Sequence, residues 1–167
     1  MSQLATFNLI DTSKLSDLST NAEIVITKSF LSKKTVDNYW TYLNDNSTSL
    51  HGLNPEDLNG GIFLNAVLYL KDKKGLDLEQ STYSKISTDI TQKRHVTTLI
   101  LTKDHRDKFN LVIDTENISF AECQAINVEY DEDDSEESAN DIKEALKILQ
   151  QILSKVYDDK VVVFSIG

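Results

Sequence analysis

Three histidines and one cysteine are the residues of this sequence whose side chains could do acid–base, nucleophilic or metal chemistry. His51, His95 and His105 stand far apart, and none has a second histidine three or four residues away, so no local zinc-binding pattern is present. The lone Cys123 has no evident histidine partner, and we interpret it as a reduced, partly buried residue. No phosphate-binding loop, dinucleotide fingerprint or serine-nucleophile motif occurs. We therefore expect no catalytic residue, metal or cofactor, and we favour a protein that is not an enzyme.

A small-molecule pocket is the alternative chemistry that the sequence allows. Residues 44–61 are polar and hold four of the residues that break regular structure, so they predict a long loop. Long loops in compact domains often carry function. In this interpretation the pocket lies near the loop, with Trp40, His51 and His95 beside it. Trp40 itself is predicted to be a core residue of the preceding helix.

Acidic residues concentrate in one segment of the chain. Residues 104–141 hold 13 acidic and two basic side chains, whereas the rest of the chain is nearly neutral. Carboxylates this dense repel one another and do not pack in a core. One interpretation is a solvated loop that also places anions at the start of the next helix, and another is a docking surface for a basic partner. The carboxylates of the densest run are Glu129, Asp131, Glu132, Asp133, Asp134, Glu136 and Glu137.

The overall composition excludes several classes of protein. The 167 residues include 17 basic and 27 acidic side chains, a formal net charge of −10, which argues against a nucleic-acid binder. The longest apolar stretch, Ile62–Leu70, is far shorter than the ~20 residues of a membrane span. The first residues lack the basic and apolar regions of a secretory signal. We expect a cytoplasmic protein with no membrane and no nucleic-acid partner.

Apolar periodicity predicts an α+β domain that spans residues 1–167, with a small sheet covered by several helices. The stripe Val36, Tyr39, Trp40, Leu43 predicts a helix over 33–44, and 24–26 suits either a short strand or the turn before it. A long amphipathic helix is expected over 139–157, followed by a terminal strand buried on both faces. Strands are predicted at 5–10, 96–102 and 161–166, and further helices at 12–20, 62–70, 82–91, after Thr102 and after Ser119.

The order of these elements resembles the YfbM-like family, a bacterial domain of unknown function. The resemblance spans nearly the whole chain and rests on short motifs. It implies an α+β fold and a small intracellular bacterial protein, and it supplies no catalytic residues. The motifs that carry it are the opening Phe7–Leu15 segment, the Tyr39–Leu43 helix, Asn65–Leu68, Leu101-Thr102 before a helix, and the acidic stretch, long helix and closing strand that ends in Ile166-Gly167.

These observations favour a non-catalytic protein-binding module. Its acidic segment would dock a basic partner, as bacterial immunity proteins do against cationic toxin domains, which is an analogy of charge. A housekeeping assembly partner without a site of its own is a further interpretation.

Overall fold

The computed structural model describes residues 3–28, 32–54 and 57–167 of the chain. Its main sheet is antiparallel, with the strand order β4-β1-β6-β5. The strands are β1 (Ala5–Asp11), β4 (Ser47–Ser49), β5 (Thr97–Leu101) and β6 (Lys160–Ile166). The predicted terminal strand is therefore central in the sheet, where both of its neighbours use its backbone groups.

Alternating side chains of β6 reach two separate cores, one on each face of the sheet. Val162 and Phe164 pack in the core on one face, and Val161 and Val163 pack in the core on the other. Successive side chains of a strand point to opposite faces, so a central strand covered on both sides must be apolar almost throughout. This pattern confirms the predicted burial of residues 161–166.

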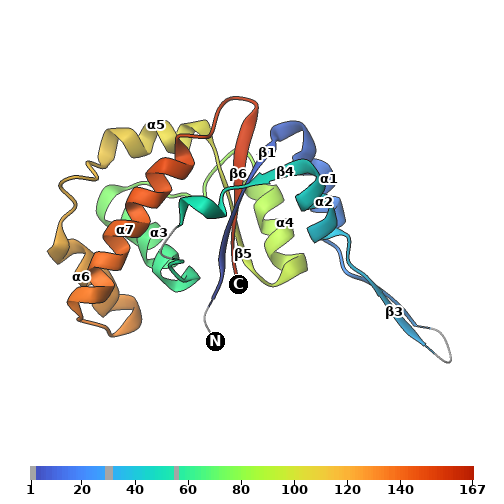
Figure 1. Cartoon of the computed structure of the whole chain (residues 1–167), viewed down its shortest axis with the longest axis horizontal. Coiled ribbons are helices and arrows are strands. Elements are labelled where there is room, and N and C mark those ends of the chain that lie inside the picture. The colour runs from blue at the N-terminus through green and yellow to red at the C-terminus, as the bar shows by residue number, and fades with distance from the viewer. Residues whose placement is uncertain (1–2, 29–31, 55–56) are drawn as a thin grey trace.

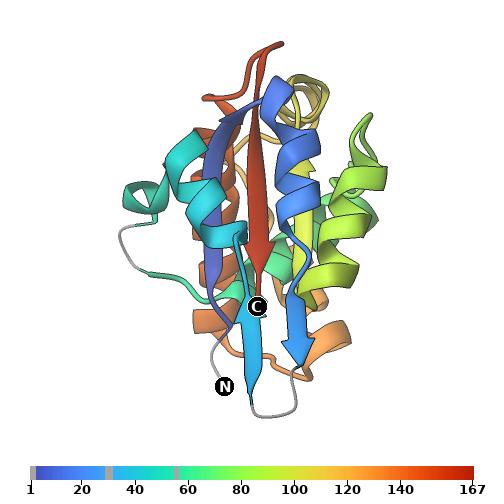
Figure 2. The same cartoon turned by 90° about the vertical axis from the view of Figure 1, so that its right-hand side faces the viewer.

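Helices cover both faces of the sheet, which confirms the α+β class (Figures 1 and 2). The helices α3 (Gly60–Lys74), α5 (Lys103–Val112), α6 (Phe120–Asp131) and α7 (Glu136–Leu153) form one layer. The helices α1 (Leu15–Asn21), α2 (Tyr39–Asn46) and α4 (Ser84–Arg94) form the other. A single turn of 3-10 helix, Thr12–Lys14, joins β1 to α1.

The ends of α3 and α7 follow from their flanking residues. The side chain of Asn59 accepts the backbone N–H groups of the first turn of α3, and Gly75 ends that helix in the left-handed region. Helix α7 starts three residues earlier than expected. Its N-cap is Ser135, whose hydroxyl accepts the backbone N–H of Ser138.

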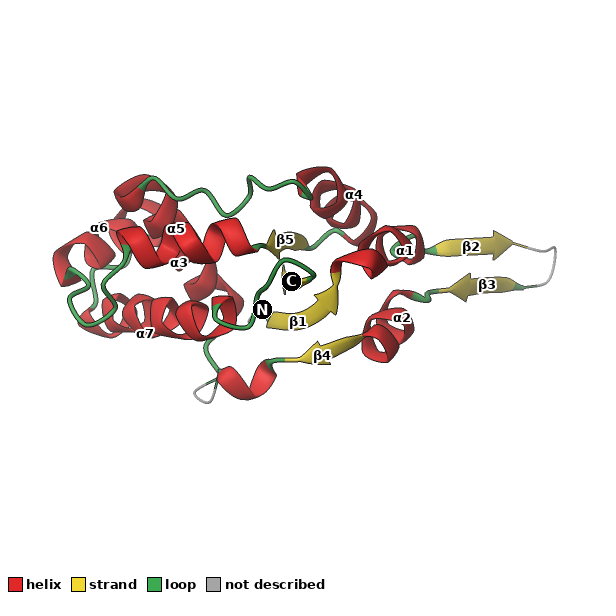
Figure 3. Ribbon diagram, turned by 90° about the horizontal axis from the view of Figure 1, so that it is seen from above, coloured by secondary structure: helices red, strands yellow, loops and turns green. Residues whose placement is uncertain are grey.

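A two-stranded hairpin stands outside the main sheet and corrects the helix predicted over 33–44. Its strands are β2 (Val25–Lys28) and β3 (Lys33–Val36), and Figure 3 shows them projecting from the body. Residues 33–36 are therefore extended, and only Tyr39–Asn46 is helical. Val36 falls outside the helix, so the spacing that it shares with Tyr39 carried no helical information.

The loop predicted over 44–61 is partly regular structure. It holds the end of α2, the edge strand β4 and a 3-10 turn at His51–Leu53 before α3 begins. Strand β4 consists only of serine and threonine and pairs with β1 through three residues. A polar edge strand this short has no apolar alternation, which is why the sequence pattern suggested a loop.

Candidate functional site

An open cavity of about 340 Å³ lies between α2 and the β4 edge of the sheet. Residues of β1 form its floor: Thr6 and Asn8 belong to the same face of the strand as Ile10, which packs in the core beneath α1 and α2. Ser49 of β4 lies opposite Asn8 in the strand register. The lining residues are Leu4, Thr6, Phe7, Asn8, Trp40, Leu43, Asn44, Ser49 and His51.

The cavity offers an aromatic wall and neutral hydrogen-bonding groups. Asn8 is only 9% exposed, and the buried Oγ1 of Thr6 has no hydrogen-bond partner within the described residues. The Oγ of Ser49 accepts the backbone N–H of His51 at 3.3 Å. None of the nine lining residues is a carboxylate, a lysine or an arginine. Apart from His51 the lining holds no acid–base side chain, so it suits binding of an uncharged polar molecule better than acid–base catalysis.

Trp40 is a wall of this cavity and is not a core residue as the sequence predicted. Its side chain is 44% exposed, whereas the neighbouring Tyr39 is fully buried. Because α2 begins at Tyr39, the inward face is set by Tyr39 and Leu43, four residues apart, and Trp40 lies about 100° away around the helix. The Arg94 guanidinium lies over both rings, 4.9 Å from the Tyr39 centroid and 5.7 Å from that of Trp40.

Asp37 fixes this arginine. Arg94 donates two hydrogen bonds to the Asp37 carboxylate, at 2.8 and 2.9 Å. The guanidinium lowers the pKa of Asp37 below its ordinary value, mainly through these hydrogen bonds. The Asp37–Arg94 pair therefore ties the start of α2 to the end of α4 beside the cavity.

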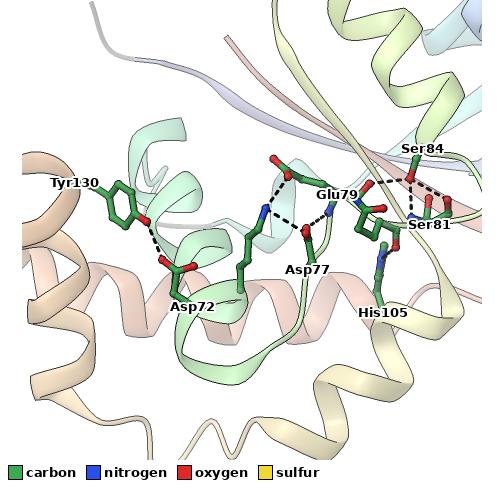
Figure 4. Close-up of polar contacts among 9 residues, drawn as sticks. Asp72, Asp77, Glu79, Ser81, Ser84, His105 and Tyr130 are labelled. Carbon is green, nitrogen blue, oxygen red and sulfur yellow. Dashed lines mark hydrogen bonds and ion pairs between the residues drawn. The ribbon is translucent and has the colours of Figure 1, made fainter.

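The three histidines lie in three different environments. His51 shares the cavity with Trp40, as the pocket hypothesis predicted. His95 does not line the cavity; it ends α4 in the left-handed region with φ 56°. His105 is buried, and its Nδ1 accepts the backbone N–H of Thr102 at 3.2 Å. Its Nε2 donates to the carbonyl of Gln80 at 2.9 Å, and Figure 4 shows where the His105 ring lies. Burial lowers the pKa of His105. In its neutral form the side chain completes the capping box at the start of α5.

The acidic run lies at the junction of two helices. The term acidic surface is used below for the carboxylates of Glu129, Asp131, Glu132, Asp133, Asp134, Glu136 and Glu137. Helix α6 continues to Asp131 and α7 begins at Glu136, so only residues 132–135 connect the two helices. The segment is thus mostly helical, and the solvated loop that the sequence suggested is four residues long.

Two carboxylates of the acidic surface are held by the protein and the others point into solvent. Asp131 accepts a hydrogen bond from the buried Asn65 of α3. Asp133 accepts the backbone N–H of Ser135 at 2.9 Å and the hydroxyl of Ser138, and these hydrogen bonds lower its pKa. The other five carboxylates make no ion pair with any residue that the structure describes.

A shallow groove of about 520 Å³ adjoins the acidic surface on α6, and the sequence prediction missed it. Ala121, Ala125 and Val128 recur at the spacing of one helix face, opposite the buried Cys123 and Ile126. Val128 is 48% exposed. The sequence signal that could have revealed the groove is this second apolar stripe on α6. The prediction of a short helix after Ser119 did not use this stripe. The groove is lined by Ala121, Gln124, Ala125, Val128, Glu129 and Asp134.

On the face of α6 that points away from the groove, polar side chains join α6 to α3. Glu122 accepts hydrogen bonds from the Tyr69 hydroxyl at 2.9 Å and from Lys74 at 2.8 Å. The Tyr130 hydroxyl donates to Asp72 at 2.8 Å (Figure 4). Cys123 is buried beside Glu122, and burial raises the pKa of its thiol to about 11, so the thiolate needed for a nucleophile is not formed near neutral pH.

Comparison with known proteins identifies no relative: no family model matches the chain, and no curated protein or solved structure is significantly similar to it. Over the described ranges, no group of three or more histidine, cysteine, aspartate or glutamate side chains is arranged to hold a metal ion. None of the helices in the same ranges is long and apolar enough to cross a membrane.

Proposed function

We propose that the protein is a non-catalytic protein-binding module that docks a basic partner through the acidic surface and the adjoining groove on α6. The observation that carries this proposal is the juxtaposition of solvent-exposed carboxylates with an exposed apolar stripe. Glu129 and Asp134 line the same groove as Ala125 and Val128. A partner segment with apolar and basic side chains matches this pattern.

Charge distribution supports the same proposal. Elsewhere in the described chain, lysines and arginines form nine ion pairs with neighbouring carboxylates, but the acidic surface takes part in none of them. Its negative field is therefore not neutralised locally. Such a field steers a positively charged partner and raises its association rate, and salt screens the effect over about 8–10 Å at physiological ionic strength.

The YfbM-like assignment and a cytoplasmic location belong to the same proposal. The short motifs that resemble this family support both, and an intracellular binding module is consistent with them. The proposed docking depends only on the opposite charges of the two surfaces, so it does not depend on this family assignment.

The test uses a synthetic amphipathic helix of leucines and lysines as a basic probe. Its binding is measured by fluorescence anisotropy at about 0.01 M and about 0.15 M salt, where screening lengths are about 30 and 8 Å. The variant carries Glu129→Gln, Glu132→Gln and Asp134→Asn, which spares the two held carboxylates. We expect weaker binding and a smaller salt dependence in this variant.

A matched control changes the net charge equally at exposed positions outside α6, α7 and the loops that join them, through Glu23→Gln, Asp45→Asn and Asp159→Asn. The control should bind the probe like the unmodified protein. Equal binding by both variants would contradict the proposal, because the overall charge and not the acidic surface would then attract the probe.

A second candidate function, binding of a small uncharged molecule, is supported by the cavity that brings Trp40 and His51 together with Asn8. Trp40 is the only tryptophan, so its fluorescence reports occupancy directly. Adenosine, an uncharged ring with hydrogen-bond donors and acceptors, is a suitable first probe. Binding should quench or shift the emission and should weaken in His51→Ala but not in His95→Ala. An unchanged emission spectrum at a high adenosine concentration would contradict binding of adenosine in this cavity.

A further inference from the structure

The hairpin of β2 and β3 is a basic arm whose two faces are both uncovered. Val25 is 50% exposed and Ile26 is 49% exposed, although residues of this type are usually buried. A two-stranded hairpin standing alone is only marginally stable in water. Exposed apolar side chains on such an arm are typical of a contact site for a partner.

Lysines dominate the outer half of the basic arm. In the strand register Lys28 lies directly opposite Lys33, and like charges in this position repel each other. Lys34 is opposite Thr27. None of the three lysines forms an ion pair with the residues that the structure describes. Carboxylates from a partner would relieve the repulsion between Lys28 and Lys33.

The basic arm and the acidic surface lie at opposite ends of the molecule. Figures 1 and 3 show the hairpin projecting at one end and α6 at the other, with the sheet between them. The arm of one molecule therefore cannot reach the acidic surface of the same molecule. Another copy can present that surface to it.

The basic arm and the α6 groove each combine apolar and charged side chains, and their charges are opposite. Because side chains alternate along a strand, one face of the arm carries Ile26 together with Lys28 and Lys33. The groove on α6 is lined by Val128 together with Glu129 and Asp134. Each end thus presents an apolar residue beside charges, and the charges are of opposite sign.

We infer that the basic arm of one copy docks on the acidic surface and α6 groove of a second copy. This inference rests on the proposed function and names its partner. Since the contact joins two different surfaces, it is heterologous. The pair of copies keeps one free arm and one free acidic surface, which gives head-to-tail chains or closed rings. An arm of two short strands covers little area, so the contact is weak and depends on salt.

The charge of the whole molecule favours this partner over a nucleic acid or an anionic membrane. Three lysines face a net charge of −10, which repels an extended polyanion from the rest of the protein. A second copy places its acidic end against the arm and its own basic arm far away. Outside its seven acidic-surface carboxylates and its three arm lysines, the second copy carries 14 basic and 20 acidic side chains, so the attraction is confined to the contact between arm and acidic surface.

The experiment uses sedimentation velocity over a wide range of protein concentration. The arm variant carries Lys28→Gln, Lys33→Gln and Lys34→Gln, and the acidic variant carries Glu129→Gln, Glu132→Gln and Asp134→Asn. We expect the unmodified protein to sediment faster as its concentration rises at about 0.01 M salt, and less so at about 0.15 M. Each variant alone should stay monomeric. A matched control, Lys85→Gln with Lys108→Gln and Lys155→Gln, should associate like the unmodified protein.

Mixing the two variants is the decisive step. The acidic variant retains the arm and the arm variant retains the acidic surface, so an equimolar mixture should form a 1:1 dimer that cannot grow further. A mixture that stays monomeric, or an unmodified protein that is monomeric at every concentration, overturns the inference. So does arm-dependent binding of a labelled DNA duplex that exceeds self-association.

The leucine–lysine probe separates this inference from the proposed function. If the unmodified protein binds the probe through its acidic surface but does not self-associate, the docking surface stands and the second copy is the wrong partner. If the probe does not bind, the proposed function fails, and the inference fails with it.

Discussion

At the scale of single residues, His105 shows how a titratable side chain can serve structure alone. Its Nδ1 accepts the backbone N–H of Thr102, and its Nε2 donates to the carbonyl of Gln80, so the ring must stay neutral. Protonation would place a second N–H against the Thr102 donor. The lowered pKa of His105 expresses this cost together with the cost of burying a charge.

The stability of the protein should therefore fall when the pH drops below about 6.5, the ordinary pKa of histidine. Below that pH the unfolded chain binds a proton at residue 105 that the folded chain excludes, and the loss continues down to the lowered folded pKa. The free energy of unfolding should fall by at most about 1.4 kcal/mol per pH unit in this range. Urea unfolding between pH 5 and 8 measures it. His105→Gln keeps a capping-box residue without a titrating group, so its profile should be flatter; parallel profiles would contradict this role.

Tyr39 and Trp40 are adjacent aromatic residues with opposite roles, and their substitution should separate core from cavity. Tyr39→Ala removes a fully buried ring and should lower the free energy of unfolding by about 3–5 kcal/mol. Trp40→Ala removes a half-exposed ring and should cost about 1 kcal/mol. Urea denaturation of both variants measures the difference. A larger loss for Trp40→Ala would restore the core role that the sequence suggested.

At the scale of elements, the start of α3 and the end of β6 lie so close together that a side chain at residue 60 would clash. A Cβ at Gly60 would lie 2.5 Å from the Cγ2 of Ile166 and 3.0 Å from the Cβ of Gln3. The backbone of α3 therefore leaves no room for a Cβ between itself and the Ile166 side chain. The sequence pattern indicates that a helix starts at Asn59-Gly60. It does not indicate that this helix start lies against the terminal strand.

Gly60→Ala should consequently destabilise the protein by about 1–3 kcal/mol, because the added methyl group forces the helix away from the sheet. Gly52→Ala is the matched control, since a Cβ there has no neighbouring atom within 4 Å and the backbone is compatible with alanine. The control should be neutral or slightly stabilising. Thermal unfolding of both variants tests the contact, and equal melting temperatures would show that α3 can shift without loss.

Elements with one strong local pattern were predictable, and those defined by a distant partner were not. β6, α3 and α7 have continuous or periodic apolar residues that report their burial directly. β3 and β4 are polar and exist because β2 and β1 pair with them. The cavity was half predictable: Trp40 and His51 are close in sequence, whereas Asn8 joins them only through the pairing of β1 with β4. His95 was misassigned because nothing local reveals that it ends a helix.

At the scale of the whole molecule, the excess of negative charge is concentrated at one end and should oppose folding slightly. Changing Glu129, Glu132 and Asp134 to their amides lowers the excess without removing a hydrogen bond made by these carboxylates. The triple variant should be at least as stable as the unmodified protein at low ionic strength, and the difference should shrink as salt is added. Thermal unfolding at several salt concentrations measures it.

Glu122→Gln is the control for that prediction. Its carboxylate pairs with Lys74 and accepts from Tyr69, so its loss should destabilise the protein instead. A triple variant that loses as much stability as Glu122→Gln would show that the exposed carboxylates stabilise the fold.

The pairing of β1 with β6 has a consequence for protein synthesis. Asp11 and Lys160, which face each other across the two strands, are 149 positions apart, so a ribosome working at about 5–20 residues per second makes β6 some 7–30 s after β1. During that interval β1 has no central neighbour, and its apolar residues have no complete core. The nascent chain therefore cannot complete its sheet until β6 has been made. The yield of folded protein should depend on chaperones that bind unfinished chains during this interval.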